Sequence, residues 1–207
     1  MPHALASNPT PLSLPLIAVW PYAPVFWVIF VATFLPEWSL ALRQRKLART
    51  APQDAGSRRI IMIGNTVGAW CAFAVAFLWR AGAIAHEQVA FWTGVALLVG
   101  GAALRRHCFR MLGGSFTGSV LVRPGQEIVR RGAYRRIRHP SYTAAFLIMG
   151  GIGLALGNWL SLAVMLAMSV IVYGNRVRVE ERALVETLGE PYRAYMRQTK
   201  RFLPFIL

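Results

Sequence analysis

The sequence alternates between apolar blocks about as long as a bilayer is thick and loops that hold almost all of its positive charge. The blocks run from about Leu14 to Leu35, Ile60 to Trp79, Val89 to Leu104, Ser141 to Leu156 and Trp159 to Tyr173. The third can continue as a helix through residues 105–112. Only Gly157 and Asn158 separate the last two, which predicts a tight helical hairpin. We therefore expect an all-α integral membrane protein with five transmembrane helices.

The basic residues give an independent test of this count. Of the 23 Lys and Arg residues, 22 lie in three segments, which are residues 36–59, residues 105–140 and the tail after Tyr173. These segments share one side of the membrane only if the chain crosses it five times. The positive-inside rule then predicts an external amino terminus and a cytoplasmic carboxyl terminus. This segregation argues against a soluble nucleic-acid-binding protein, the other common class with a net charge of +15.

The length of 207 residues predicts a single membrane domain. Residues 1–110 are expected to form a three-helix part, and residues 111–207 a part that carries the chemistry. Pro21 and Pro24 predict a kink in the first apolar block. Cys71 and Cys108 form no CxxC motif and lie near no paired histidines, so they predict packing residues, with neither a disulfide nor a metal site.

The last block is expected to extend beyond the membrane. From Trp159 to Leu188 only Gly174 is unfavourable in a helix, and a helix of that length spans about 45 Å against about 30 Å of hydrocarbon. Gly189 and Pro191 then end it and begin a short helix. Apolar and tyrosine side chains at helical spacing follow, which predicts a cytoplasmic carboxyl-terminal helical cap folded back on the bundle.

The segment from Met111 to Tyr142 is the first candidate site. Pro140, directly after His139, predicts that a helix starts at the cytoplasmic interface, where free N–H groups and the positive end of the dipole favour an anionic ligand. Alternatively, the basic run from Arg130 to Arg138 only anchors the helix to anionic lipid headgroups. The charge pattern leaves both interpretations open.

The second candidate site is on the last long helix. Arg176 and Glu180 lie one turn apart on the same helix face, and Glu181 follows. Ionisable residues at a membrane interface inside a bundle are functional candidates. The alternative is a solvated helix surface with internal salt bridges.

Together these segments resemble a known family. The run from Gly132 to Tyr142 is similar to the GxYxxxRHPxY segment of the isoprenylcysteine carboxyl methyltransferase family. Downstream, Arg176, Glu180, Glu181, Leu184 and the stretch LGEPYRAYMRQTKRFLPF are similar to its pattern R…EE…L…FGxxYxxY…R…P. The upstream LGGSFT also fits, so the resemblance covers about Leu112 to Phe205. Relatives of this family include phospholipid N-methyltransferases.

The resemblance implies an integral-membrane methyltransferase that uses S-adenosylmethionine. It implies that Arg176 holds the methyl acceptor and that Glu180 takes part in catalysis. The positions that match its cofactor pocket and the loop around it are Gln126, Gly132, Tyr134, Arg138, His139, Pro140, Tyr142, Glu180 and Glu181. Many members have His where this chain has Gln126, and Gln keeps a donor and an acceptor but not the charge.

Three functions are compatible with these features. The first is methylation of the carboxylate of an isoprenylcysteine-like or other lipophilic acceptor. The second is N-methylation of a phospholipid amine, in which a carboxylate would act as a general base. The third is a non-catalytic or reductase-like membrane protein on the same scaffold. A polar cofactor would enter from the cytoplasm, and a lipophilic or prenylated substrate would enter sideways from the membrane lipids. The sequence shows neither the acceptor, nor its contacts in the first three blocks, nor the oligomeric state.

Overall fold

The protein is a bundle of long helices, seen in a computed structural model that describes residues 14–43, 52–113 and 119–202. The α-helices are α1 (Tyr22–Arg43), α3 (Ser57–Leu78), α4 (Glu87–Leu112), α5 (Pro140–Ala155), α6 (Trp159–Leu188) and α7 (Glu190–Gln198). The short 3-10 helices are η1 (Leu16–Ala18), η2 (Pro52–Asp54), η3 (Arg80–Gly82) and η5 (Gly132–Arg135). In these ranges the only β structure is two isolated bridges.

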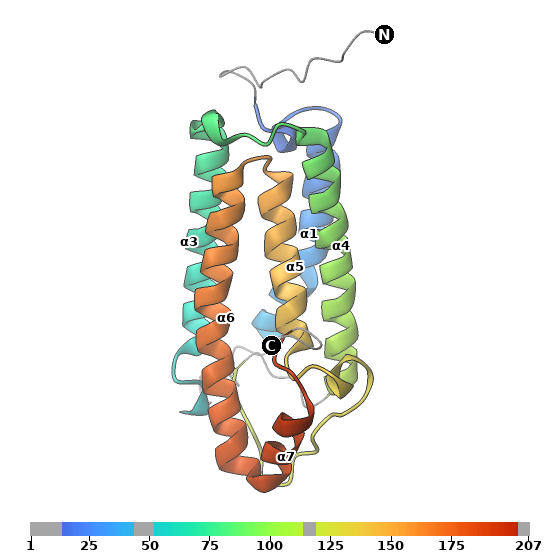
Figure 1. Ribbon diagram of the computed structural model, residues 1–207, viewed down its shortest axis with the longest axis vertical. Coiled ribbons are helices and arrows are strands. Elements are labelled where there is room, and N and C mark those ends of the chain that lie inside the picture. Colours follow the sequence, from blue (N-terminus) through green and yellow to red (C-terminus); the bar gives the residue numbers. More distant parts are fainter. Residues whose placement is uncertain (1–13, 44–51, 114–118, 203–207) are drawn as a thin grey trace.

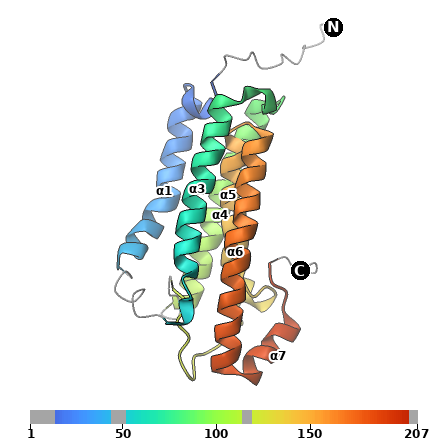
Figure 2. The ribbon, with the colours of Figure 1, turned by 90° about the vertical axis from the view of Figure 1, so that its left-hand side faces the viewer.

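Five of these helices run alongside one another and form the membrane-spanning part (Figures 1 and 2). By length and composition, α1, α3, α4 and α6 are each able to cross a membrane. α5 is apolar but has only 16 residues, which corresponds to about 24 Å. It lies between α4 and α6, and ten of its residues are buried. The predicted all-α membrane fold is confirmed, and α5 packs as a shorter apolar helix among the four helices of spanning length.

α5 can lie at the centre because two glycines let it touch α4. A Cβ atom at Gly151 would lie 2.6 Å from the carbonyl oxygen of Gly94 and 2.8 Å from the backbone nitrogen of Leu98. Small residues at such points allow the backbones of membrane helices to approach closely. Ile148 and Ile152 then fill the same interface and are almost fully buried.

The predicted hairpin between α5 and α6 is also confirmed. Gly157 has a positive φ of 66° and turns the chain. The side chain of Asn158 accepts hydrogen bonds from the backbone N–H groups of Leu160 (2.9 Å) and Ser161 (3.2 Å), so it caps the start of α6. Its amide nitrogen donates to the carbonyl oxygen of Trp79 (2.8 Å), which joins the hairpin to the end of α3.

The first helix differs from the prediction at both ends. It begins at Tyr22 and not near Leu14, and it continues to Arg43. Pro24 therefore lies in the first turn, where the missing N–H has no intrahelical partner to lose, so the kink predicted from Pro21 and Pro24 is wrong. Residues 16–18 instead form η1, with Ile17 buried in the core.

Pro36, which was assigned to the first loop, lies inside α1. Proline cannot donate to the carbonyl oxygen four residues earlier, which here belongs to Ala32. The guanidinium of Arg106 on α4 donates to that oxygen at 2.6 Å. Because a neighbouring helix satisfies the freed acceptor, α1 continues through the proline.

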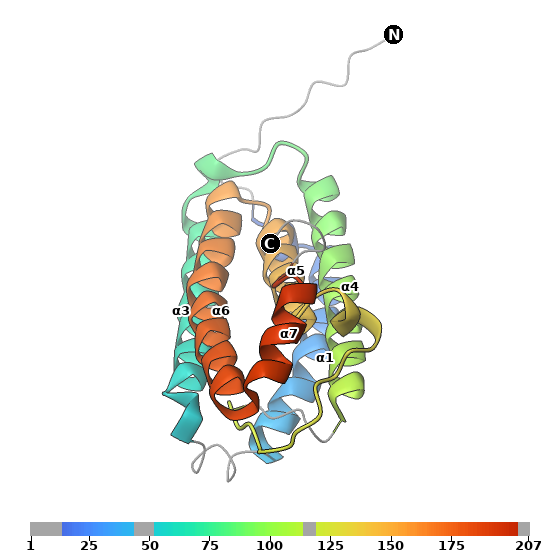
Figure 3. The same cartoon turned by 60° about the horizontal axis from the view of Figure 1, so that its bottom comes forward.

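The helical cap is present as predicted (Figures 1 and 3). α6 extends past the other helices, ends at Gly189, where φ is +62°, and α7 folds back beside it. Residues 199–202 then run along residues 136–139. The backbone N–H of Arg138 donates to the carbonyl oxygen of Lys200 (2.7 Å), and that of His139 donates to the carbonyl oxygen of Arg201 (3.0 Å). These bonds connect the end of the described chain to the start of α5.

Candidate active site

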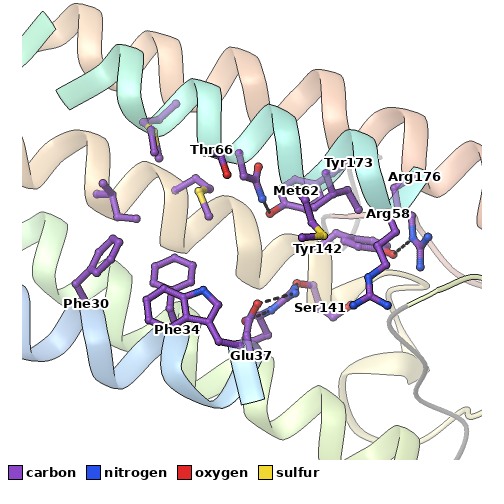
Figure 4. A pocket seen from close by; sticks show the side chains of 18 of the residues that line it. Phe30, Phe34, Glu37, Arg58, Met62, Thr66, Ser141, Tyr142, Tyr173 and Arg176 are labelled. Carbon is purple, nitrogen blue, oxygen red and sulfur yellow. Dashed lines mark hydrogen bonds and ion pairs between the residues drawn. The ribbon is translucent and has the colours of Figure 1, made fainter. Parts of the chain in front are cut away.

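A cavity of about 720 Å³ opens among the five spanning helices. Its walls are mainly apolar and aromatic, with Trp27, Phe30 and Phe34 from α1, Met62, Trp70 and Phe73 from α3, Met149 and Ile152 from α5, and Met165 from α6. Figure 4 shows Phe30 near one end and Arg176 at the other. We call this space the large cavity. Its apolar walls and membrane position suit a lipid chain.

The end of the large cavity nearest α7 is polar. Glu37, Arg58, Arg105, Ser141, Tyr142 and Arg176 line it (Figure 4). Arg105 forms an ion pair with Glu37, and its Nη1 donates to the carbonyl oxygen of Ser141 at 2.9 Å. The cavity therefore has an apolar body and a charged end, which is the shape of an amphiphile.

A smaller cavity of about 130 Å³ lies beyond this polar end. We call it the small cavity. It lies between the segment 119–129, the start of α5, the projecting part of α6, and α7. Its lining includes the phenol groups of Tyr134, Tyr142, Tyr192 and Tyr195, the carboxylate of Glu180, and the side chains of Arg138 and His139.

The two cavities share three lining residues, Ser141, Tyr142 and Arg176. The hydroxyl of Tyr142 donates to Oε2 of Glu180 (2.7 Å) and accepts from Nε of Arg176 (3.1 Å). Arg176 and Glu180 were predicted to share a helix face, and Tyr142 connects them. This junction is the point where a molecule in one cavity would meet a molecule in the other.

Asp54 holds Arg176 in place, and the sequence did not indicate this. Nη1 of Arg176 contacts Oδ1 of Asp54 (2.5 Å) and Oγ of Ser57 (2.6 Å). The backbone N–H of Val120 donates to the same oxygen of Asp54 (2.9 Å), and that of Arg58 donates to its other oxygen (3.1 Å). Burial opposes ionisation, but these bonds and the Arg176 charge hold the pKa of Asp54 below its usual value.

Glu181 faces a different group of residues from Glu180. Its carboxylate accepts from Nε of Arg138 (3.0 Å) and lies 3.3 Å from Nε2 of His139 and 2.8 Å from Nη2 of Arg201. Nη1 of Arg138 also donates to the carbonyl oxygens of Met196 (2.9 Å) and Thr199 at the end of α7. Glu181 and Arg138 thus join α6, α5 and the cap.

Most of the residues predicted to bind a cofactor surround the small cavity. Gln126, Tyr134, Arg138, His139, Tyr142 and Glu180 line it, as does Arg176, which was predicted to hold the acceptor. Pro140, Gly132 and Glu181 lie outside that lining: Pro140 starts α5, and Gly132 has a φ of +56° and packs on Met111. Part of the LGGSFT motif, residues 114–117, lies outside the described residues, as do residues 203–205.

The loop that carries Tyr134 and Gln126 has its own contacts. The hydroxyl of Tyr195 donates to the carbonyl oxygen of Tyr134 (2.6 Å), and burial raises the pKa of the Tyr134 phenol. The side-chain oxygen of Gln126 accepts from the backbone N–H of Arg123 (3.2 Å), which closes a turn. Gln126 therefore both shapes the loop and borders the small cavity.

The large cavity draws its walls from both halves of the chain. Glu37, Arg58 and Asn65 come from the first two spanning helices. No sequence motif marks them. The available signal was Glu37, an acidic residue just after the first apolar block in an otherwise basic segment.

These features define a class: a membrane helical bundle in which a lipid-sized cavity meets a polar pocket at the interface. Residues 94–186 match the model of the isoprenylcysteine carboxyl methyltransferase (ICMT) family. A solved structure of a eukaryotic intramembrane Ras methyltransferase, ICMT, superposes with a TM-score of 0.63 at 24% identity and covers 94% of this chain and 69% of that one, so the fold is shared.

Curated relatives agree with this match. The protein-S-isoprenylcysteine O-methyltransferase of Saccharomyces cerevisiae is 31% identical over 115 residues, 55% of this chain and 48% of that one. The Arabidopsis thaliana protein-S-isoprenylcysteine O-methyltransferase B is 28% identical over 118 residues, which cover 55% of this chain and 58% of that one. The uncharacterized protein YpbQ of Bacillus subtilis is 26% identical over 101 residues, which cover 48% of this chain and 60% of that one. The chain spans roughly half the length of these relatives, and its residues 94–186 are similar to the ICMT family.

Proposed function

We propose that this protein is an integral-membrane methyltransferase that transfers a methyl group from S-adenosylmethionine to the carboxylate of a lipophilic, isoprenylcysteine-like acceptor. The observation that carries the proposal is the junction at Tyr142 and Arg176, where a lipid-sized cavity meets a polar pocket. Transfer between two bound molecules requires the reacting atoms to meet in line at such a point.

The small cavity has the side chains that S-adenosylmethionine requires. A sulfonium is stabilised by an anionic or aromatic neighbour, and Glu180, Tyr134 and Tyr142 border the cavity. A carboxylate is stabilised by cations and by a helix amino terminus, and Arg138 and His139 precede the first turn of α5. The donor set therefore fits the cofactor in charge and in aromatic content.

The small cavity is smaller than S-adenosylmethionine requires, so we infer that the segment 119–129 moves when the cofactor binds. Its volume of about 130 Å³ is below the roughly 300–1,000 Å³ typical of ligand sites. The segment is held at Val120 by Asp54 and at Val122 by the side-chain oxygen of Gln53 (2.7 Å). Both bonds come from η2. An outward shift of the segment would break these two bonds and would also uncover Val120 and Val122, which are packed against Val179, Ala183 and Leu184 of α6.

The large cavity suits the acceptor. From Tyr142 to Ile152 along α5 it extends for ten residues, which corresponds to about 15 Å, or half of the hydrocarbon thickness. A chain that lies in one leaflet would fit this depth. Arg176 at the polar end can then orient an acidic group toward the small cavity, since a guanidinium holds both carboxylate oxygens in one plane.

The reaction needs little chemistry from the protein. When bound, S-adenosylmethionine supplies a methyl group already activated on a sulfonium. An ionised carboxylate attacks without a general base, so this chain has to hold the acceptor, exclude water and stabilise the sulfonium. Tyr142 is placed for the second and third tasks, because it lines both cavities at the junction and its hydroxyl is bonded to Glu180.

The charge at the polar end of the large cavity weighs against the amine alternative. A phospholipid amine would be a cation at neutral pH, and three arginines, Arg58, Arg105 and Arg176, line the polar end of the large cavity against one carboxylate, Glu37. A reductase-like protein would bind a nicotinamide cofactor and not S-adenosylmethionine. A cofactor-binding assay therefore separates the third function from the first two.

The proposed function can be tested with purified protein, labelled S-adenosylmethionine and a panel of prenylcysteine analogues and phospholipids. We expect label in a product that is released by mild base, because a methyl ester is base-labile and a methylamine is not. Label that resists base would identify the N-methyltransferase, and no transfer to any acceptor in the presence of cofactor binding would reject both.

The cofactor site gives a separate prediction. His139→Ala and Glu180→Ala are each expected to weaken S-adenosylmethionine binding, because both residues line the small cavity. Removing a charged hydrogen-bonding group costs about 1.5–3 kcal/mol, which is about 10–150-fold in affinity. Isothermal titration of the extracted variants measures this. Glu186→Ala, on the same helix but outside both linings, serves as the control. Wild-type affinity in both variants would place the cofactor elsewhere.

The orientation in the membrane is part of the proposal: amino terminus outside, carboxyl terminus and active site in the cytoplasm. The described basic segments gather at one end of the bundle, whereas Arg80 lies at the other. Arg45, Lys46 and Arg49 lie outside the described residues. In a background with Cys71 and Cys108 replaced by Ala, single cysteines at the exposed positions Ala85 and Arg123 are expected to react with a membrane-impermeant thiol reagent from opposite sides. Labelling of both from one side would contradict five spans.

A further inference from the structure

Three arginines line the polar end of the large cavity, and they come from three different helices. Arg105 on α4 is paired with Glu37, and it also donates to the carbonyl oxygen of Ser141. Arg176 on α6 contacts Asp54, Ser57 and the hydroxyl of Tyr142. These bonds fix the position of Arg176 at the junction of the two cavities.

Arg58 enters the large cavity from α3, the helix that packs against α6. It lies in the first turn of α3, it is half-buried, and Figure 4 shows its side chain reaching toward the polar end near Tyr142 and Ser141. Its backbone N–H donates to Oδ2 of Asp54, whereas Oδ1 of the same carboxylate contacts Arg176. The carboxylate of Asp54 therefore holds both the backbone of Arg58 and the guanidinium of Arg176.

Unlike Arg176, Arg58 lines the large cavity but not the small one. A group bound at Arg58 therefore belongs to the molecule in the large cavity and not to the cofactor. The apolar surroundings strengthen a charged hydrogen bond at this place, because the local dielectric is lower than that of water.

We propose that Arg58 is a positioning residue that binds the acidic group of the acceptor at the polar end of the large cavity, beside Arg176. It makes the cavity selective for anionic amphiphiles over neutral or cationic ones with the same chain. The proposal rests on the proposed function for the identity of the occupant, but the selectivity itself requires no methyl transfer.

The test uses binding alone, with three probes that share one chain: dodecanoate, dodecanol and dodecylamine. Trp27, Trp38 and Trp70 line the large cavity, so the intrinsic fluorescence of the purified protein reports occupation. At pH 8, where dodecanoate is ionised, the wild-type protein is expected to bind it at least about tenfold more tightly than dodecanol, and to bind dodecylamine weakest.

Arg58→Gln is expected to weaken dodecanoate binding about 10–100-fold and to leave dodecanol binding unchanged, which also shows that the cavity is intact. Arg58→Lys should recover part of the lost dodecanoate affinity, because lysine restores the positive charge but not the planar guanidinium that binds two carboxylate oxygens. Arg59→Gln is the matched control, since Arg59 is the exposed neighbour and lines neither cavity. It should bind all three probes like the wild type.

Equal binding of the three probes by the wild-type protein would overturn the proposal. So would a loss of dodecanol binding in Arg58→Gln as large as the loss of dodecanoate binding, or normal dodecanoate binding in that variant. The proposed function fails separately, if the wild-type protein keeps this selectivity but transfers no methyl group. If methylation is observed, Arg58→Gln should raise KM for the acceptor far more than it lowers kcat.

Discussion

Replacement of Arg176 by Lys is expected to lower the single-turnover rate of methylation by about 10–150-fold, with a much smaller change in cofactor affinity. Arg176 lines both cavities and bonds at once to Asp54, Ser57 and Tyr142. A lysine offers a point charge on a flexible stem and cannot hold three partners and a carboxylate in one plane. The acceptor and the Tyr142 hydroxyl would both lose their fixed position.

The measurement pairs the single-turnover rate with the Kd of S-adenosylmethionine for the wild type and the variant. Arg178→Lys, two residues along α6 and exposed, should match the wild type in both. A near-normal rate in Arg176→Lys, or a defect confined to cofactor binding, would refute the assignment of Arg176 to the acceptor. Either result would favour an amine acceptor, which needs no cation beside it.

The contacts of Arg176 show how far the sequence could predict the site. Helical spacing placed Arg176 and Glu180 on one face, and the family motifs placed Tyr142 near them. The pairing with Asp54 could not be predicted, because Asp54 lies 122 residues away in sequence. It contacts Arg176 only because the start of α3 packs on α6. An acidic residue just before Ser57, in a chain with only eight acidic residues, was a signal for a helix start and not for this pairing.

The spanning helices followed from hydropathy, but their ends depended on specific contacts. Residues 14–21 are as apolar as a helix interior, so their composition could not show that α1 starts only at Tyr22. Pro36 reads as a helix end, and α1 continues through it because Arg106 satisfies the carbonyl oxygen of Ala32. Likewise, the sequence shows Arg58 only as one of several basic residues in a loop. In the structure α3 begins at Ser57, and Arg58 lines the large cavity.

Glu180 and Glu181 are adjacent in sequence but contact different residues. Replacement of Glu181 is expected to cause the largest loss of stability. Its carboxylate is buried and is shared by Arg138, His139 and Arg201. Arg201 is half-exposed and contributes little, whereas the side chains of Arg138 and His139 are almost fully buried. Removing one partner of a buried ion pair leaves an uncompensated charge, which costs about 3–5 kcal/mol.

Glu181→Gln should therefore lower the melting temperature by roughly 6–20 °C, at about 2–4 °C per kcal/mol for a chain of this size. The cap should unfold first, because Arg138 also donates hydrogen bonds to the carbonyl oxygens of Met196 and Thr199 at the end of α7. Hydrogen exchange of residues 190–202 would report this opening at temperatures at which the spanning helices remain protected.

The control is Glu190→Gln, which removes a carboxylate of the same kind from the same cap. Glu190 pairs with Arg197, but both side chains are exposed, so no measurable change in melting temperature is expected. A Glu181→Gln protein that melts at the wild-type temperature, with unchanged exchange in residues 190–202, would mean that Glu181 does not anchor the cap. The buried carboxylate would then be available for a ligand, and Glu181 would join Glu180 as a candidate for the cofactor site.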